Sequence, residues 1–195
     1  MHYFRTTIQS SYACQVSYIL PNSQIDPENG QYHFFIFRLK TPLNLTTPYS
    51  RAVCLPLFSQ HLPTTPFLPH DFALQAGYAV NPSAQQGPSR ITAVTSELEP
   101  PDFCSEKFRN YYGTEGFDSA KHVYCGKTVN KNSNFQSCVS YGSSLTLRLY
   151  EICFLLGLTV LHPTPPGKTH WCAAETVYFY GHFIPALDWI LDNLR

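Results

Sequence analysis

Residues 89–97, SRITAVTSE, give the clearest indication of how this chain folds. From Ile91 to Ser96 the run alternates with a period of two, and most of its residues are β-branched. Alternate side chains of a β-strand point to opposite faces, so this pattern is typical of a strand with one face in a core. Gly87-Pro88 precedes the run, as expected of a turn before a strand. We therefore predict a strand here.

Working outward from this strand, several segments share a high content of β-branched and aromatic residues: 31–39, 73–80, 123–126 and 145–161, the last forming one or two strands. Residues 31–39, QYHFFIFRL, predict a buried strand. Residues 43–70 contain five prolines and should form a surface connection. A short helix is predicted within 107–118 and an amphipathic helix over 183–195. Together these elements indicate an all-β barrel or sandwich.

Length and charge exclude several classes of protein. The 195 residues suit one domain, and Lys+Arg equal Asp+Glu at 13 each, so nothing draws the chain to a polyanion. We expect no nucleic-acid partner. Residues 152–161 are the most apolar run and are about half the length needed to cross a bilayer, so no membrane association is expected. Residues 1–20 do not have the pattern of a signal peptide.

Seven cysteines without paired C-x-x-C spacing favour disulfides over a structural zinc site. An odd number leaves at least one thiol free or bonded to another chain. The sequon Asn44-Leu45-Thr46 is a glycosylation signal that fits a secreted protein. The cysteine content therefore points to an extracellular protein, even though residues 1–20 do not have the pattern of a signal peptide.

Four motifs follow one another along the chain: FIFRLKTPL with AVCLP (residues 35–43 and 52–56), AGYA (76–79), CVSYGSSL (138–145), and TVY with LDWIL (176–178 and 187–191). In this order they resemble the chymotrypsin/trypsin family of serine proteases, peptidase S1. They stand where that family has an "IALLRL" strand with "VCLP", a "TGWG", a "C-x-G-D-S-G-G-P" nucleophile loop and a "GVYT...DWI" ending. The family's opening third, with its "TAAHC" histidine segment, has no counterpart here.

The resemblance implies a trypsin-like double β-barrel in which the first barrel is incomplete, the second is complete and a C-terminal α-helix follows. Residues 31–195 would form this partial peptidase S1-like domain. Residues 1–30 would be an N-terminal segment to which the sequence assigns no structure.

The resemblance also implies which cysteines pair: Cys104 with Cys125, and Cys138 with Cys172. Cys54 would reach a partner in another segment, which Cys14 or a second chain could supply. The family often bonds a cysteine at the position of Ala73 to the strand after the nucleophile. Because Ala73 has no thiol, Cys153 near that strand is expected to stay a buried thiol.

The catalytic requirements can be checked against the same resemblance. Acyl transfer by this route needs a serine, a histidine, an orienting carboxylate and N–H donors for the oxyanion. The alignment replaces the orienting aspartate, the oxyanion glycine, the loop aspartate and the serine by His33, Ser140, Tyr141 and Gly142. Ser143 would be the nucleophile only if the register slipped by one residue. Gln136 replaces the acidic base of the specificity pocket.

These losses predict a catalytically inactive serine-protease homologue, a pseudoprotease, that needs no cofactor or metal and acts by binding a protein or peptide. The alternatives are a serine-type endopeptidase that uses Ser143, and a truncated product of an active trypsin-like protease gene. None of the eight histidines lies in an Ala-Ala-His-Cys context, so each is expected at the surface or in a turn. A metal site at His162, His170 and Cys172 is weaker, because their spacing matches no compact ligand motif.

Overall fold

A computed structural model of the chain describes residues 15–22, 34–46, 51–56, 72–80, 91–112, 123–129, 138–149, 151–161, 167, 176–183 and 186–194. Strands account for 54% of these described residues, with a short helix at the C-terminal end. The prediction of a mostly β protein that ends in a helix is therefore confirmed.

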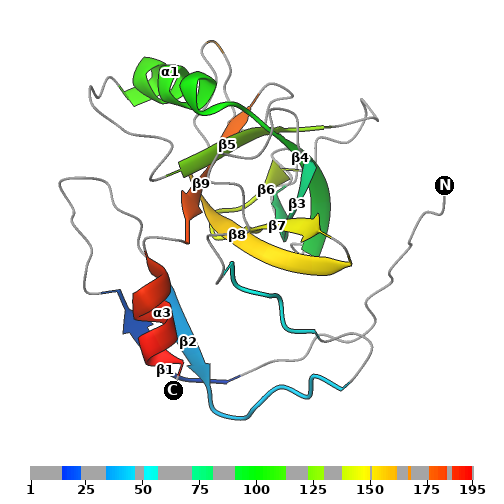
Figure 1. Ribbon diagram of the computed structural model, residues 1–195, viewed down its shortest axis with the longest axis vertical. Helices are drawn as coiled ribbons and strands as arrows, with labels where there is room; N and C mark the ends of the chain where they lie inside the picture. Colours follow the sequence, from blue (N-terminus) through cyan, green and yellow to red (C-terminus); the bar gives the residue numbers. More distant parts are fainter. Residues whose placement is uncertain are drawn as a thin grey trace.

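Six of the described strands close into an antiparallel barrel (Figure 1). They are β3 (Phe72–Val80), β4 (Ile91–Leu98), β5 (Val123–Thr128), β7 (Ser144–Leu149), β8 (Ile152–Leu161) and β9 (Val177–His182). The order around the barrel is β3-β4-β5-β9-β8-β7, and β7 pairs again with β3. The short strand β6 (Cys138–Val139) pairs with the end of β3. Closure gives every barrel strand two neighbours and removes the exposed edges of an open sheet.

The period-two pattern of residues 89–97 is confirmed in β4. Ser96 and Leu98 are buried, whereas Ile91 lies on the outer face and is exposed. A single cluster of apolar side chains fills part of the barrel: Ala73, Leu98, Leu145, Leu147, Leu156, Tyr178 and Tyr180, with Tyr124 and Phe154 packed against it. Residues 145–161 form two strands, because Glu151 adopts a φ of 72° in the turn between β7 and β8. That region of φ is uncommon for a residue with a side chain and suits a tight turn.

Helix α1 (Pro101–Tyr112) covers the outer face of the barrel next to β5 and β9. Cys104 and Phe108, one turn apart, pack against Cys125, Val177 and Phe179. The predicted helix, 107–118, began too late. Proline is favoured at the first helical position and Asp102 in the first turn complements the positive end of the helix dipole, so the helix begins at Pro101.

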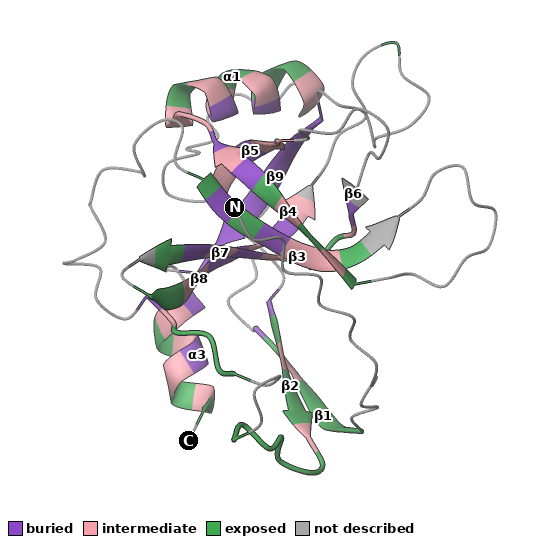
Figure 2. Cartoon of the chain, turned by 90° about the vertical axis from the view of Figure 1, so that its right-hand side faces the viewer, coloured by how far each residue is buried: buried purple, intermediate pink, exposed green. Residues whose placement is uncertain are grey.

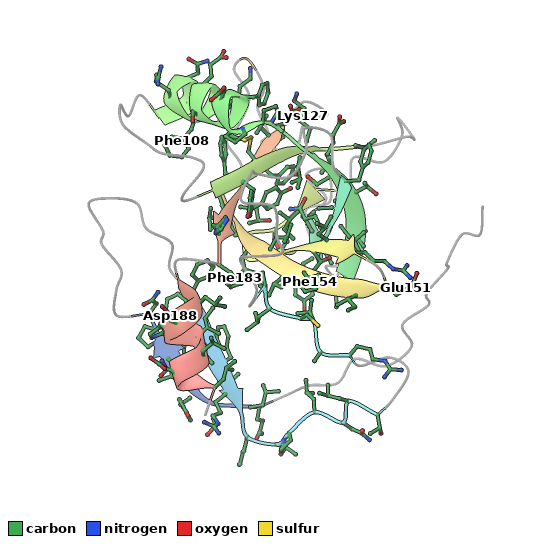
Figure 3. All side chains as sticks on the ribbon, in the orientation of Figure 1. Phe108, Lys127, Glu151, Phe154, Phe183 and Asp188 are labelled. Atoms are coloured by element: carbon green, nitrogen blue, oxygen red, sulfur yellow. A yellow bond between two sulfur atoms is a disulfide. The ribbon has the colours of Figure 1, made fainter. Side chains whose placement is uncertain are left out.

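The C-terminal helix α3 (Leu187–Asn193) is shorter than the predicted 183–195. Its buried residue Ile190 packs with Ala186, Phe183 and Phe34. The rings of Phe34 and Phe183 stack with centroids 4.8 Å apart. Phe183, labelled in Figure 3, lies between the barrel and α3. This cluster joins the C-terminal helix to the segment that leads into the second described sheet.

That second sheet is a pair of antiparallel strands, β1 (Val16–Pro21) and β2 (Phe35–Leu39). Ile19 lies opposite Phe37, and both side chains are exposed. Figure 2 shows β1 and β2 mostly in green, the colour of exposed residues. The predicted strand is therefore present over Phe35–Leu39, but the prediction that it is buried was wrong. The residues are apolar as that prediction required, but among the described strands β2 pairs with β1 alone, and no second sheet covers this face.

Candidate functional site

The loop between β6 and β7 is the candidate site, because it contains residues 140–143, which the sequence resemblance predicts to be the counterpart of a nucleophile loop. The Ser143 N–H donates to the Ser140 carbonyl at 3.2 Å and closes a four-residue turn centred on Tyr141 and Gly142. Gly142 has a φ of 74°, in the left-handed region where glycine carries no steric cost. The position that the resemblance assigns to the nucleophilic serine therefore has a backbone that favours glycine.

Ser143, the fallback nucleophile, has its hydroxyl turned into the protein. The residue is only 3% exposed, and its Oγ donates to the Ser140 carbonyl. Gly77 of β3 faces this hydroxyl so closely that a Cβ at that position would collide with Ser143 Oγ. The hydroxyl fills the space left by the missing side chain of Gly77 and is held by the turn itself.

The backbone N–H groups of the loop are also used within the chain. Ser140 N–H donates to the Tyr78 carbonyl at 3.0 Å, and Gly142 N–H donates to the Thr159 carbonyl at 2.8 Å. Thr159 N–H returns a bond to the Ser143 carbonyl at 2.8 Å. An oxyanion hole needs N–H groups aimed at an open position where charge develops. The N–H groups of Ser140, Gly142 and Ser143 instead tie the loop to its own turn, to β3 and to β8.

A buried chain of hydrogen bonds continues from this loop through the barrel. Thr159 Oγ1 donates to the Ser143 carbonyl at 3.2 Å and accepts from Gln75 Nε2 at 2.9 Å. Tyr180 donates to Gln75 Oε1 at 3.2 Å, so the 2.8 Å contact between Ser96 Oγ and the Tyr180 hydroxyl has serine as its donor. Burial raises the pKa of Tyr180 above its usual range. Because each of these polar groups has a partner, the network supports the loop at no cost in unsatisfied groups.

A second polar pair, Tyr124 and His182, lies on β5 and β9. The Tyr124 hydroxyl is 2.5 Å from His182 Nε2, and the two ring centroids are 4.5 Å apart. His182 is 7% exposed, so the expectation that every histidine lies at the surface or in a turn was wrong for this one. Burial also raises the pKa of Tyr124. Sequence reasoning missed this pair, and the only signal available was the strand-like composition around each residue.

The predicted cysteine pairing is present where it can be compared. Cys104 of α1 and Cys125 of β5 form a disulfide. Cys138 lies in β6, but its side chain and the whole of Cys172 lie outside the described residues, as does Cys14. Cys153 is an exposed free thiol rather than a buried one, because it lies where β8 extends beyond β9. Cys54 is also free and exposed, and its N–H donates to the Cys153 carbonyl at 2.9 Å.

The remaining predicted site residues are divided between described and undescribed parts of the chain. Asn44 lies in an exposed segment after β2. His33 and Gln136 lie outside the described residues. His162 and His170 of the alternative metal site lie outside them as well. Within the described part of the chain, no three His, Cys, Asp or Glu side chains are arranged to hold a metal ion.

No protein-family model matches the chain, and no curated protein is significantly similar to it in sequence. Neither of the helices described here is long and apolar enough to cross a lipid bilayer.

Proposed function

We propose that this chain is a catalytically inactive, secreted homologue of trypsin-like serine proteases that acts by binding a protein or peptide. The observation that carries the proposal is the Ser140–Ser143 loop. The Ser143 hydroxyl and three backbone N–H groups of this loop are hydrogen-bonded within the chain. Glycine occupies the position at which the resemblance expects the nucleophile. A loop of this kind retains the framework of the family motif without its chemistry.

The architecture supports the family part of the proposal. The resemblance implies a complete second barrel followed by a helix, and the closed barrel of β3, β4, β5, β7, β8 and β9 followed by α3 is compatible with it. In this interpretation β1 and β2 are the remaining piece of an incomplete first barrel. The AGYA and CVSYGSSL motifs also meet in space, because β3 pairs with both β6 and β7.

The chemistry supports the loss of activity. A serine becomes a nucleophile when a neighbouring base accepts its proton, and the tetrahedral intermediate then needs donors that are free to bind the oxyanion. Ser143 already donates its hydrogen to a backbone carbonyl that is part of its own turn. To react, it would have to leave that contact and its contact with Gly77. We therefore infer that the serine-endopeptidase alternative would require the whole loop to rearrange.

The outer surface of the barrel supports a binding role. Four large apolar side chains are exposed on the two neighbouring strands β3 and β4: Phe72, Leu74, Tyr78 and Ile91. Tyr78 lies directly opposite Ile91, so two of them form one cross-strand pair. Exposed large apolar side chains that gather on neighbouring strands are a feature of protein interaction surfaces. Since the chain carries no net charge, an apolar protein surface suits it better than a strongly charged partner.

Secretion is part of the same proposal. The Cys104–Cys125 disulfide is compatible with an oxidising compartment, where such bonds form and persist. The bridge joins α1 to β5 within a buried apolar cluster, so it has a structural place in the fold.

The test is labelling of the full chain with a fluorophosphonate, followed by intact mass measurement. We expect no adduct under conditions in which an active trypsin-like protease is labelled completely, because the probe reacts only with an activated serine. Ser143→Ala is the matched control variant. A stoichiometric adduct on the parent chain that disappears in Ser143→Ala would show an active serine and would overturn the proposal.

A further inference from the structure

The segment that follows β2 places the sequon in an accessible and ordered turn. Asn44 Oδ1 accepts hydrogen bonds from the Thr46 N–H at 2.9 Å and from Thr46 Oγ1 at 2.6 Å. A side-chain oxygen that binds the backbone two residues later forms an Asx-turn. Every residue from Lys40 to Thr46 is exposed, so the turn projects from the surface.

These two bonds use only the carboxamide oxygen of Asn44. Both donors come from Thr46 and bind the same oxygen, Oδ1, so Thr46 holds the Asn44 amide through its oxygen and not through Nδ2. Among the described residues, Nδ2 donates no hydrogen bond. The hydroxyl at the third position of the motif is therefore already in contact with the amide group that a glycosylating enzyme must recognise.

We propose that Asn44 is a site of N-linked glycosylation. The donor is an oligosaccharide linked to a lipid pyrophosphate. A bond forms between Nδ2 and C1 of the first sugar, the bond from C1 to the pyrophosphate oxygen breaks, the nitrogen loses a proton and the lipid pyrophosphate leaves. No electron is exchanged with an oxidant or reductant. The proposal rests on the secretion part of the proposed function and is independent of whether the chain is catalytically active.

The surroundings of Asn44 give the glycan a physical role. Leu43 and Leu45, its two neighbours, are 50% and 46% exposed. The segment begins beside the antiparallel pair of β1 and β2, the β1–β2 hairpin, because the Lys40 N–H donates to the Gln15 carbonyl at 2.8 Å. This hairpin exposes Ile19 and Phe37. A bulky hydrophilic glycan at this point would keep water-exposed apolar side chains away from other molecules.

The sequence supplies its own negative control. Asn44 is the only asparagine followed two residues later by Ser or Thr without an intervening proline. Asn81-Pro82-Ser83 has the same spacing, but proline at the middle position prevents modification. A single glycan per chain is therefore expected, and its site can be assigned without ambiguity.

The test is expression of the full chain behind a cleavable secretion signal in mammalian cells. Both the cell lysate and the medium are treated with peptide N-glycosidase, and intact masses are compared. We expect loss of one glycan from the parent chain, with aspartate left at position 44. Thr46→Ser, which keeps the hydroxyl, should retain the glycan, whereas Asn44→Gln and Thr46→Ala should lose it.

An unmodified parent chain in both fractions, with the Cys104–Cys125 bridge formed, would overturn the proposal, because the chain would have folded in the right compartment without being glycosylated. A fluorophosphonate adduct on a glycosylated chain would instead overturn the proposed function and leave this inference intact. The role of the glycan has a separate readout. Secreted yield should fall in Asn44→Gln and recover when Leu43 and Leu45 are also changed to serine; equal yields of parent and Asn44→Gln would contradict that role.

Discussion

The barrel and the β1–β2 hairpin are built from similar residues but bury them to very different extents. Phe179 of β9 is fully buried between the barrel and α1, whereas Phe37 of β2 is 57% exposed. Both lie in antiparallel strands rich in aromatic and β-branched residues. The difference is closure of the sheet. Each barrel strand pairs on both sides, whereas among the described strands β1 and β2 pair only with each other. A two-stranded sheet alone is marginally stable in water, so the hairpin depends on what packs against it.

The two regions also differ in whether their hydrogen-bonded polar side chains are buried or exposed. In the barrel, Tyr180 is fully buried and is bonded to Gln75 and Ser96. In the hairpin, Tyr18 accepts a bond from Arg38 at 3.0 Å on the exposed surface. A buried polar group that loses its partner cannot turn to water, whereas an exposed one can. The same chemical change should therefore cost more in the barrel, and matched substitutions can measure that difference.

The largest expected contrast is between Phe179→Ala and Phe37→Ala. Removing a buried phenylalanine leaves a cavity, so Phe179→Ala should lower the free energy of unfolding by about 3–5 kcal/mol. Phe37→Ala should change it by less than about 0.5 kcal/mol. Urea denaturation followed by circular dichroism measures both. Equal losses would mean that Phe37 is buried in solution and would break the comparison.

The next effect concerns the disulfide that ties α1 to the barrel. Its cysteines are separated by 21 positions, and a bridge that closes a loop of that length stabilises a protein by about 3 kcal/mol. The double variant Cys104→Ala/Cys125→Ala should lose about this much in urea denaturation of the oxidised protein. Cys54→Ala/Cys153→Ala removes two exposed free thiols and should stay within about 0.5 kcal/mol of the parent. A comparable loss in this control would indicate that those thiols also form a bond.

The same contrast explains which predictions from sequence succeeded. Local pattern was sufficient in β4, where the alternation from Ile91 to Ser96 matches the two faces of a barrel strand. Local pattern was insufficient in β2. An apolar run indicates that a strand could be buried, but it does not show whether another element of the fold covers that strand. The strand β1 was missed because its residues are mixed in polarity, and β9 was not recognised as a strand from its pattern because all six of its residues are buried and no alternation remains.

For the candidate site, the sequence resemblance predicts which catalytic groups are replaced but does not predict how the loop residues are arranged in space. Gly142 could be read as a lost serine, but its positive φ and the inward hydroxyl of Ser143 depend on Gly77 and Thr159, which are distant in sequence. The pairing of Tyr124 with His182 likewise follows from the β5–β9 register, in which Tyr124 lies opposite Tyr180. Such contacts are set by closure of the barrel and cannot be found from local spacing.

A smaller effect is expected from removing one hydroxyl from a buried tyrosine of the barrel and one from an exposed tyrosine on its outer face. Tyr180→Phe would leave Gln75 Oε1 and Ser96 Oγ without their partner and should cost about 1–3 kcal/mol. Tyr78→Phe removes a hydroxyl from a side chain that is 55% exposed and should change stability by less than about 0.5 kcal/mol. Urea midpoints of the two variants, taken in one buffer, give the comparison. Two equal and small losses would show that water reaches the interior of the barrel.

A further effect is expected in the response of the barrel to alkaline pH. Burial raises the pKa of Tyr178 to about 12, opposed in part by its hydrogen bond to the Val139 backbone, and burial acts in the same direction on Tyr124 and Tyr180. The unfolded chain ionises near pH 10, so the folded state holds these protons more tightly. Their contribution to stability is complete below about pH 10 and is lost as the pH rises toward 12.

Within that window each buried tyrosine should lower the free energy of unfolding by about 1.4 kcal/mol per pH unit, and Tyr178→Phe should make the fall less steep by that amount. Brief urea titrations at successive pH values measure the slope, and tyrosinate absorbance of the folded protein reports ionisation directly. A lag of the folded absorbance behind that of the unfolded chain is the expected sign of closure. Ionisation of every tyrosine in step with the unfolded chain would mean that the barrel does not protect its tyrosines from ionisation.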